Sequence, residues 1–127
     1  MARVLWICLA GALGTGARYG IGLWAGRTLG ADFPYGTLIV NLVGCFLIAA
    51  VTHVALTTTL VSPTLRLTLT TGFMGGLTTY SSFNLETTRL LQERAWLAGL
   101  VNFGITVVGC FVAGLLGLAT ARWLVGP

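Results

Sequence analysis

Three long stretches of the chain contain no charged residue, and this feature constrains the fold more than any other. The stretches cover residues 33–65, 67–85 and 95–121. A helix that crosses a bilayer needs about 20 consecutive apolar residues, so each stretch is about long enough for one span. Residues 4–26 form a fourth apolar stretch that only Arg18 interrupts. The pattern predicts an all-α membrane protein with four transmembrane helices.

The composition excludes several classes of function. Charged residues make up only 8% of the 127 residues and hydrophobic residues make up 56%, whereas a soluble domain carries about 25% charged residues. The seven basic residues are all Arg and are scattered singly, whereas a nucleic-acid binder has a clustered basic patch. We therefore expect that the protein is not an enzyme and that it has no nucleic-acid partner. We expect one domain, residues 1–127, that crosses the inner (plasma) membrane several times in contact with lipid.

Helix-start signals divide the chain into its expected spans. Asp32 is a suitable N-cap, and Pro34 is tolerated in a first helical turn because its missing N–H is not needed there. Ser62 and Pro63 repeat this signal before the third apolar stretch. We predict the four spans at about residues 4–27, 34–58, 63–91 and 96–123.

The arginines outside the spans do not favour either orientation of the chain in the membrane. Positively charged loops normally stay in the cytoplasm, but here three arginines fall on each side of the membrane. Insertion in both orientations follows, and two copies would pair as an antiparallel, dual-topology homodimer. Alternatively, the equal numbers are an accident of where the span boundaries are drawn. One side holds Arg3, Arg66 and Arg122, and the other holds Arg27, Arg89 and Arg94.

Glycines spaced four residues apart let helix backbones approach closely. Such glycines pack helices either between two subunits or within one subunit. The sequence does not show which glycines do which. The pairs are Gly16 and Gly20, Gly22 and Gly26, and Gly72 and Gly76, and Gly109, Ala113 and Gly117 form a similar stripe.

Three cysteines lie in apolar stretches: Cys8, Cys45 and Cys110. Their number is odd and their spacing is not that of metal ligands. We interpret them as small packing residues.

The third span contains an unusual polar segment. Gly75 and Gly76 weaken a helix, and four Ser and Thr residues follow between residues 78 and 82. We predict a break near residues 75–79 in the middle of the membrane, where free carbonyls would suit a cation and free N–H groups an anion. The alternative is a glycine kink whose Ser and Thr side chains bond back to the helix.

Two kinds of side chain near this break are suited to an anion. Tyr80 and Phe83 are three residues apart and share a helix face, and an aromatic ring has a positive edge. Asn41 lies in the middle of the second span, where its amide must find partners. Either it bonds a neighbouring helix or its NH₂ donates to a passing anion. Packing explains the aromatic pair equally well, and bonding between helices equally explains Asn102 and Thr106.

Three segments of the sequence resemble the signature segments of the Fluc/CrcB family of fluoride channels. They are residues 11–19, 36–44 and 72–83, and the third is the most specific. The resemblance implies an antiparallel homodimer with two pores, to each of which both subunits contribute. It implies passive, selective export of cytoplasmic fluoride, which lowers fluoride toxicity.

The resemblance also implies site residues. It places an amide donor, two aromatic edges, two hydroxyls and a carboxylate along the fluoride pathway. It further implies a structural Na⁺ at the dimer centre, held by the carbonyls of Gly75 and Thr78. The pathway residues are Asn41, Tyr80, Ser81, Ser82, Phe83 and Glu86.

One residue departs from the family pattern, which has Phe where this chain has Tyr80. The extra hydroxyl would donate to the ion, displace it or slow its passage.

A second function remains open from the sequence. A proton-coupled exporter of the small multidrug resistance type also has four spans and dual topology, but it needs a membrane-embedded carboxylate. The first span has none, and Glu86 lies toward the end of a span. A packing subunit without transport would leave the polar segment unexplained.

Overall fold

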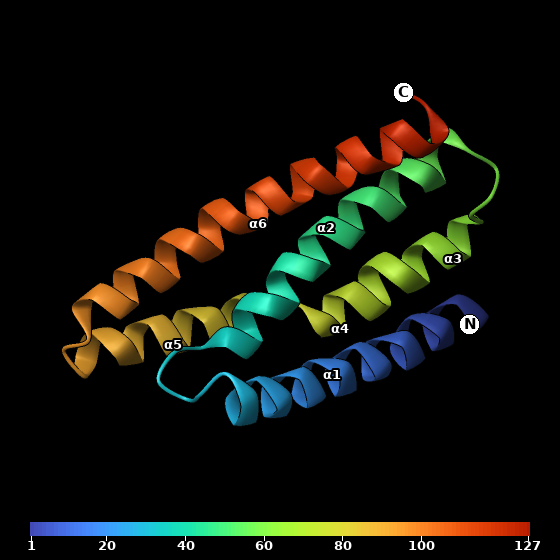
Figure 1. Ribbon diagram of the computed structural model, residues 1–127. Coiled ribbons are helices and arrows are strands. Elements are labelled where there is room, and N and C mark those ends of the chain that lie inside the picture. Colours follow the sequence, from blue (N-terminus) through green and yellow to red (C-terminus); the bar gives the residue numbers. More distant parts are fainter.

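Three long helices form most of the molecule. The computed structural model describes all 127 residues and contains helices and short connections but no strand (Figure 1). By length and composition, each of the three is able to cross a membrane. They are α1 (Ala2–Thr28), α2 (Tyr35–Thr57) and α6 (Trp96–Val125). The all-helical prediction is confirmed.

The remaining helical segment, predicted at residues 63–91, is not one continuous helix. Thr78 and Thr79 have extended backbones, with ψ angles of 154° and 113°. Gly75 and Gly76 themselves stay helical, so the interruption follows the glycine pair rather than falling on it. The segment comprises α3 (Pro63–Leu67), the π-helical η1 (Thr68–Met74), α4 (Gly75–Leu77) and α5 (Tyr80–Gln92).

The two predicted helix starts have different outcomes. Ser62 caps α3, since its hydroxyl accepts from the Leu65 N–H at 3.2 Å, and Pro63 is the first helical residue. The prediction for Asp32 is wrong: α2 begins at Tyr35, with Pro34 in the cap position and no side-chain cap. Pro34, rather than Asp32, occupies the position from which a side chain caps the first turn.

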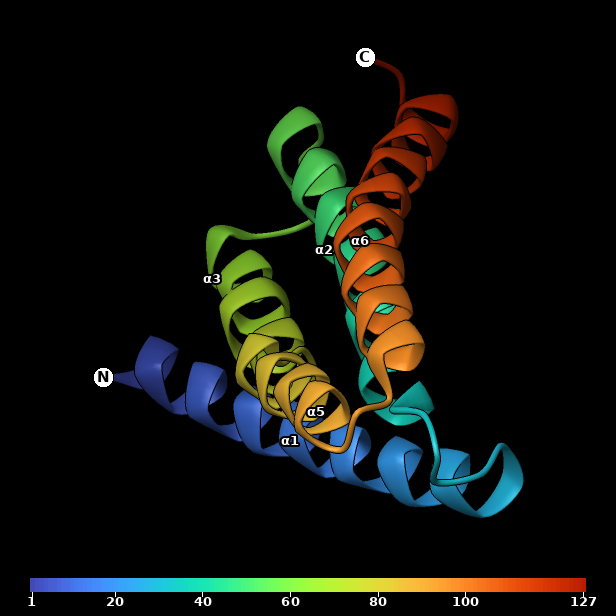
Figure 2. The ribbon, with the colours of Figure 1, turned by 90° about the vertical axis from the view of Figure 1, so that its left-hand side faces the viewer.

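Figures 1 and 2 place α1 and α6 on opposite sides of the molecule, with α2 and the segmented helix between them. Glycines set these contacts within the chain. A side chain at Gly76 would overlap the carbonyl of Gly11 in α1, and one at Gly117 would overlap the carbonyl of Phe46 in α2. Gly16 and Gly20, by contrast, face open space with no atom within 4 Å. The structure therefore separates packing glycines from glycines on a free surface.

The N-terminus, the C-terminus and the α2–α3 connection lie at one end of the molecule (Figure 1). The Arg3 Nε donates to the Thr64 hydroxyl at 3.3 Å, and the His53 Nε2 lies 2.9 Å from the Gly126 carbonyl oxygen. The two termini and the α2–α3 connection therefore lie on one side, as the predicted order of four spans requires.

Candidate functional site

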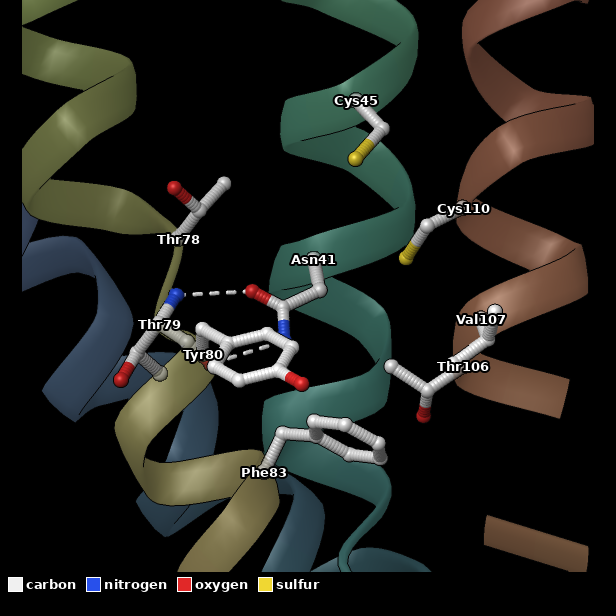
Figure 3. Close-up of a pocket in the computed structure, with 9 residues that line it drawn as sticks. All are labelled: Asn41, Cys45, Thr78, Thr79, Tyr80, Phe83, Thr106, Val107 and Cys110. Atoms are coloured by element: carbon white, nitrogen blue, oxygen red, sulfur yellow. Dashed lines mark hydrogen bonds between the residues drawn. The ribbon is translucent and has the colours of Figure 1, made fainter. Parts of the chain in front are cut away.

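The amide of Asn41 joins α2 to the interruption between α4 and α5. Its Nδ2 donates to the Thr79 carbonyl at 3.0 Å, and the Thr79 N–H donates to its Oδ1 at 2.7 Å (Figure 3). Both residues are buried. The extended backbone of Thr79 would otherwise leave two polar groups unpaired in an apolar interior. One N–H of the amide remains without a partner in the chain.

Thr79 also starts α5. Its hydroxyl accepts from the Ser82 N–H at 3.2 Å, and it lies 3.2 Å from the Ser81 hydroxyl and 3.1 Å from the Ser82 hydroxyl. The three hydroxyls thus form one group at the first turn of α5. The sequence pattern includes Thr79 in the polar segment but does not assign it to the site. Its place inside the predicted break was the signal that could have done so.

These bonds free two carbonyls. In a continuous helix the Gly75 carbonyl would accept from the Thr79 N–H and the Thr78 carbonyl from the Ser82 N–H. The Thr79 N–H instead donates to Asn41, and the Ser82 N–H donates to the Thr79 hydroxyl. Neutral backbone oxygens without helical donors are ligands that suit a hard cation. The two carbonyls implied as Na⁺ ligands therefore fit that group.

The two aromatic residues of α5 lie against each other but differ in exposure. Their ring centroids are 5.4 Å apart at 63°, an edge contact. Phe83 is only 3% exposed and also stacks on Phe103, with centroids 6.2 Å apart. Tyr80 is 75% exposed, and its hydroxyl makes no hydrogen bond within the chain. The ring of Tyr80 therefore lies on the outer side of the pair.

A cavity of about 330 Å³ brings part of the predicted site together. No charged residue lines it, so its polar groups are neutral dipoles, hydroxyls and thiols. Of the predicted pathway residues, Asn41, Tyr80 and Phe83 line it, whereas Ser81, Ser82 and Glu86 do not. The lining residues are Asn41, Cys45, Thr78, Thr79, Tyr80, Phe83, Thr106, Val107 and Cys110 (Figure 3).

Glu86 lies outside this cavity, beside the start of α2. Its Oε1 accepts from the Thr37 hydroxyl at 2.7 Å, and its Oε2 is buried without a partner. It lines a separate polar hollow of about 540 Å³ that Asp32 and Glu93 also line. All three acidic residues of the chain therefore meet at this end of the molecule.

A second buried amide joins α6 to α5. The Asn102 Nδ2 donates to the Thr87 hydroxyl at 2.8 Å, and that hydroxyl donates to the Phe83 carbonyl at 2.7 Å. The Thr106 hydroxyl lies 3.5 Å from the Asn102 Oδ1. Asn102 therefore bonds a neighbouring helix, as expected, whereas Thr106 bonds Asn102 within α6 itself and not another helix.

Comparison with known proteins identifies the family. The model of the family described as CrcB-like protein, Camphor Resistance (CrcB), matches residues 5–118. A Fluoride-specific ion channel FluC of Sorangium cellulosum (strain So ce56) is 57% identical over 125 residues, 98% of each chain. Another, of Anaeromyxobacter sp. (strain K), is 50% identical over 126 residues, 99% of this chain and 100% of the relative. A third, of Citrifermentans bemidjiense, is 43% identical over 98% of this chain and 100% of the relative.

The family match covers most of the chain, and these relatives align with it over nearly its whole length. This multi-pass membrane protein therefore belongs to the CrcB family.

Proposed function

We propose that the chain is a subunit of a passive, fluoride-selective channel that releases cytoplasmic fluoride; two of its relatives are named fluoride-specific ion channels. The observation that carries this proposal is the uncharged cavity at the α4–α5 interruption. Fluoride is small and strongly hydrated, so a pore must replace its water with hydrogen-bond donors. A positively charged side chain in the pathway would hold the ion too tightly for release, whereas neutral donors allow it to leave.

The cavity offers such donors from separate elements. Asn41 has one amide N–H that Thr79 does not use, and the ring edge of Phe83 carries partial positive charge. The Ser81 and Ser82 hydroxyls lie at the first turn of the same helix. We infer that fluoride passes these groups and Tyr80, with Glu86 farther along the pathway.

The single chain supports assembly into an antiparallel homodimer. Tyr80 is largely exposed although its ring lines the cavity, so a second subunit is needed to enclose the pathway. Gly16 and Gly20 leave a face of α1 with nothing packed on it, and small residues at this spacing suit close contact between membrane helices. The equal numbers of arginines on the two sides support insertion in both orientations.

The carbonyls of Gly75 and Thr78 would hold Na⁺ at the centre of such a dimer. The ion would supply a fixed positive charge that stabilises the freed backbone oxygens. The Asn41–Thr79 bonds support this assignment because they remove the helical donor from the Gly75 carbonyl.

The proton-coupled exporter is not favoured. Coupling requires a carboxylate that both proton and substrate reach in the membrane. Glu86 instead accepts from Thr37 and lies outside the central cavity.

Efflux from liposomes tests the proposed function. Purified protein should release fluoride when a potassium ionophore balances charge, with no release of chloride and no coupled proton movement. Asn41→Asp should abolish the flux, because a carboxylate replaces the amide donor and repels the anion. Chloride or proton movement without fluoride flux would reject the proposal.

A further inference from the structure

Two thiols line the cavity and have no role in the proposed function. Cys45 on α2 and Cys110 on α6 both line it, and both are free. Each lies four residues beyond a polar lining residue on the same helix, Asn41 and Thr106 respectively. Residues at this spacing share a helix face. Each thiol therefore lies one helical turn from a polar group of the cavity, and Cys45 lies one turn from the proposed fluoride donor Asn41 (Figure 3).

The packing of α2 on α6 keeps these thiols together. The side chains of Cys110 and Cys45 line the same cavity from these two neighbouring helices (Figure 3). A side chain at Gly114 would lie 3.8 Å from the Cys45 carbonyl, and one at Gly117 would overlap the carbonyl of Phe46. The helix backbones are thus in close contact on the C-terminal side of both cysteines. Cys8, in contrast, is exposed on α1 and lies outside the cavity.

We propose that Cys45 and Cys110 together form a binding site for a soft, thiophilic metal cation that accepts two ligands in linear geometry. Sulfur ligands select soft metals. No group of three or more His, Cys, Asp or Glu side chains in the chain could hold a metal ion, so a single chain does not supply the tetrahedral protein site that Zn²⁺ prefers. Two thiols that line one cavity match the needs of Hg²⁺, Ag⁺ or Cu⁺.

Charge balance favours such a complex in this cavity. When Hg²⁺ binds, both thiols lose their protons to solvent, and the two new S–Hg bonds form a neutral bis-thiolate. A monovalent ion displaces one proton and also leaves a neutral complex. No charged residue lines the cavity, so a neutral occupant avoids the cost of burying an unpaired charge.

Occupancy should also stop fluoride movement, since the metal would fill space beside Asn41 and Phe83. This second consequence rests on the proposed function, whereas metal binding itself does not. Binding and flux must therefore be measured separately.

Mercuric ion is the probe, and Cys8→Ser is the background because it removes the exposed thiol on α1. Under anaerobic conditions, this variant should bind one Hg²⁺ per chain, measured by metal analysis and by sulfur-to-mercury charge-transfer absorption. Adding Cys45→Ser or Cys110→Ser should each weaken binding by about 100-fold or more, because one anchor no longer holds the ion for the other. Fluoride efflux of the background variant, relative to its own metal-free rate, should fall on Hg²⁺ addition and return with excess dithiothreitol.

The outcomes separate the two claims. Equal Hg²⁺ affinity in the background and in either added variant, or no binding at all, would overturn the dithiol site. Binding of one Hg²⁺ through both thiols, in a protein that never conducts fluoride, would support the site and count against the proposed function. Tight binding that leaves an existing fluoride flux unchanged would overturn the link between the site and the pathway.

Discussion

Two buried asparagines in the middle of long helices hold α5 in different ways. Asn41 on α2 bonds the backbone of Thr79, with one bond to the carbonyl and one from the N–H. Asn102 on α6 donates to the side chain of Thr87. The two amides are similarly buried, at 7% and 1% exposure, so burial alone does not distinguish them.

The difference lies in what remains if each amide is lost. Thr79 is outside any helix, and lipid offers no replacement hydrogen bonds, so its backbone depends on Asn41. Thr87 keeps its own bond to the Phe83 carbonyl whether or not Asn102 is present. We therefore expect the loss of an amide that bonds non-helical backbone to lower the free energy of unfolding more than the loss of an amide that bonds a side chain on an intact helix.

The largest effect is expected for Asn41→Ala. It leaves the N–H and carbonyl of Thr79 unpaired, and each buried unpaired group costs about 1–3 kcal/mol. We expect a loss of roughly 2–4 kcal/mol in the free energy of unfolding, together with loss of fluoride efflux. Denaturant titration in detergent micelles measures the first quantity and liposome efflux the second. Wild-type stability in this variant would show that Thr79 does not depend on the amide.

Phe83 is connected to the surroundings of both asparagines, and Phe83→Ile tests this connection. The Phe83 carbonyl accepts from Thr87, while its ring lines the cavity beside Asn41. The substitution keeps the carbonyl and removes the ring edge. We expect fluoride efflux to fall roughly tenfold, equivalent to about 1.4 kcal/mol in the barrier, with the oligomeric state unchanged in size-exclusion chromatography. Unchanged efflux would remove this ring from the pathway.

Asn102→Ala should have a smaller effect. It deletes one donor to a hydroxyl that remains bonded elsewhere, and hydrogen bonds between membrane helices contribute about 0.6–2 kcal/mol. We expect a stability loss of about 1–2 kcal/mol and efflux that persists. The same two assays, run beside Asn41→Ala, provide the comparison. Loss of efflux equal to that of the Asn41 variant would contradict the proposed difference between the roles of Asn41 and Asn102.

The sequence identified both asparagines but not the difference between them. Long uncharged stretches are local patterns, so they predict the helices well, and the Ser62 cap was predicted for the same reason. The partner of Asn41 is set by how α2 meets residues 38 positions away, which no local pattern encodes. The bonds of Thr79 to Asn41 arise from that contact, so the sequence marked Thr79 only by its place inside the predicted break. The glycine spacing likewise did not reveal that Gly76 packs within the chain while Gly16 does not.

Tyr80→Phe should have the smallest effect on stability, because the Tyr80 hydroxyl takes no part in the hydrogen bonds of Asn41 or Asn102. Tyr80 is exposed in the single chain and makes no hydrogen bond within it, and surface substitutions of this kind usually stay within about 0.5 kcal/mol. Efflux then separates the roles open to the hydroxyl: a slower flux in the variant identifies a donor to fluoride, and a faster flux identifies an obstruction. A stability loss well above 0.5 kcal/mol would instead mean that the hydroxyl has a partner from a second subunit. That result would extend the contrast between the two asparagines to a third polar group, one whose partner lies outside the chain altogether.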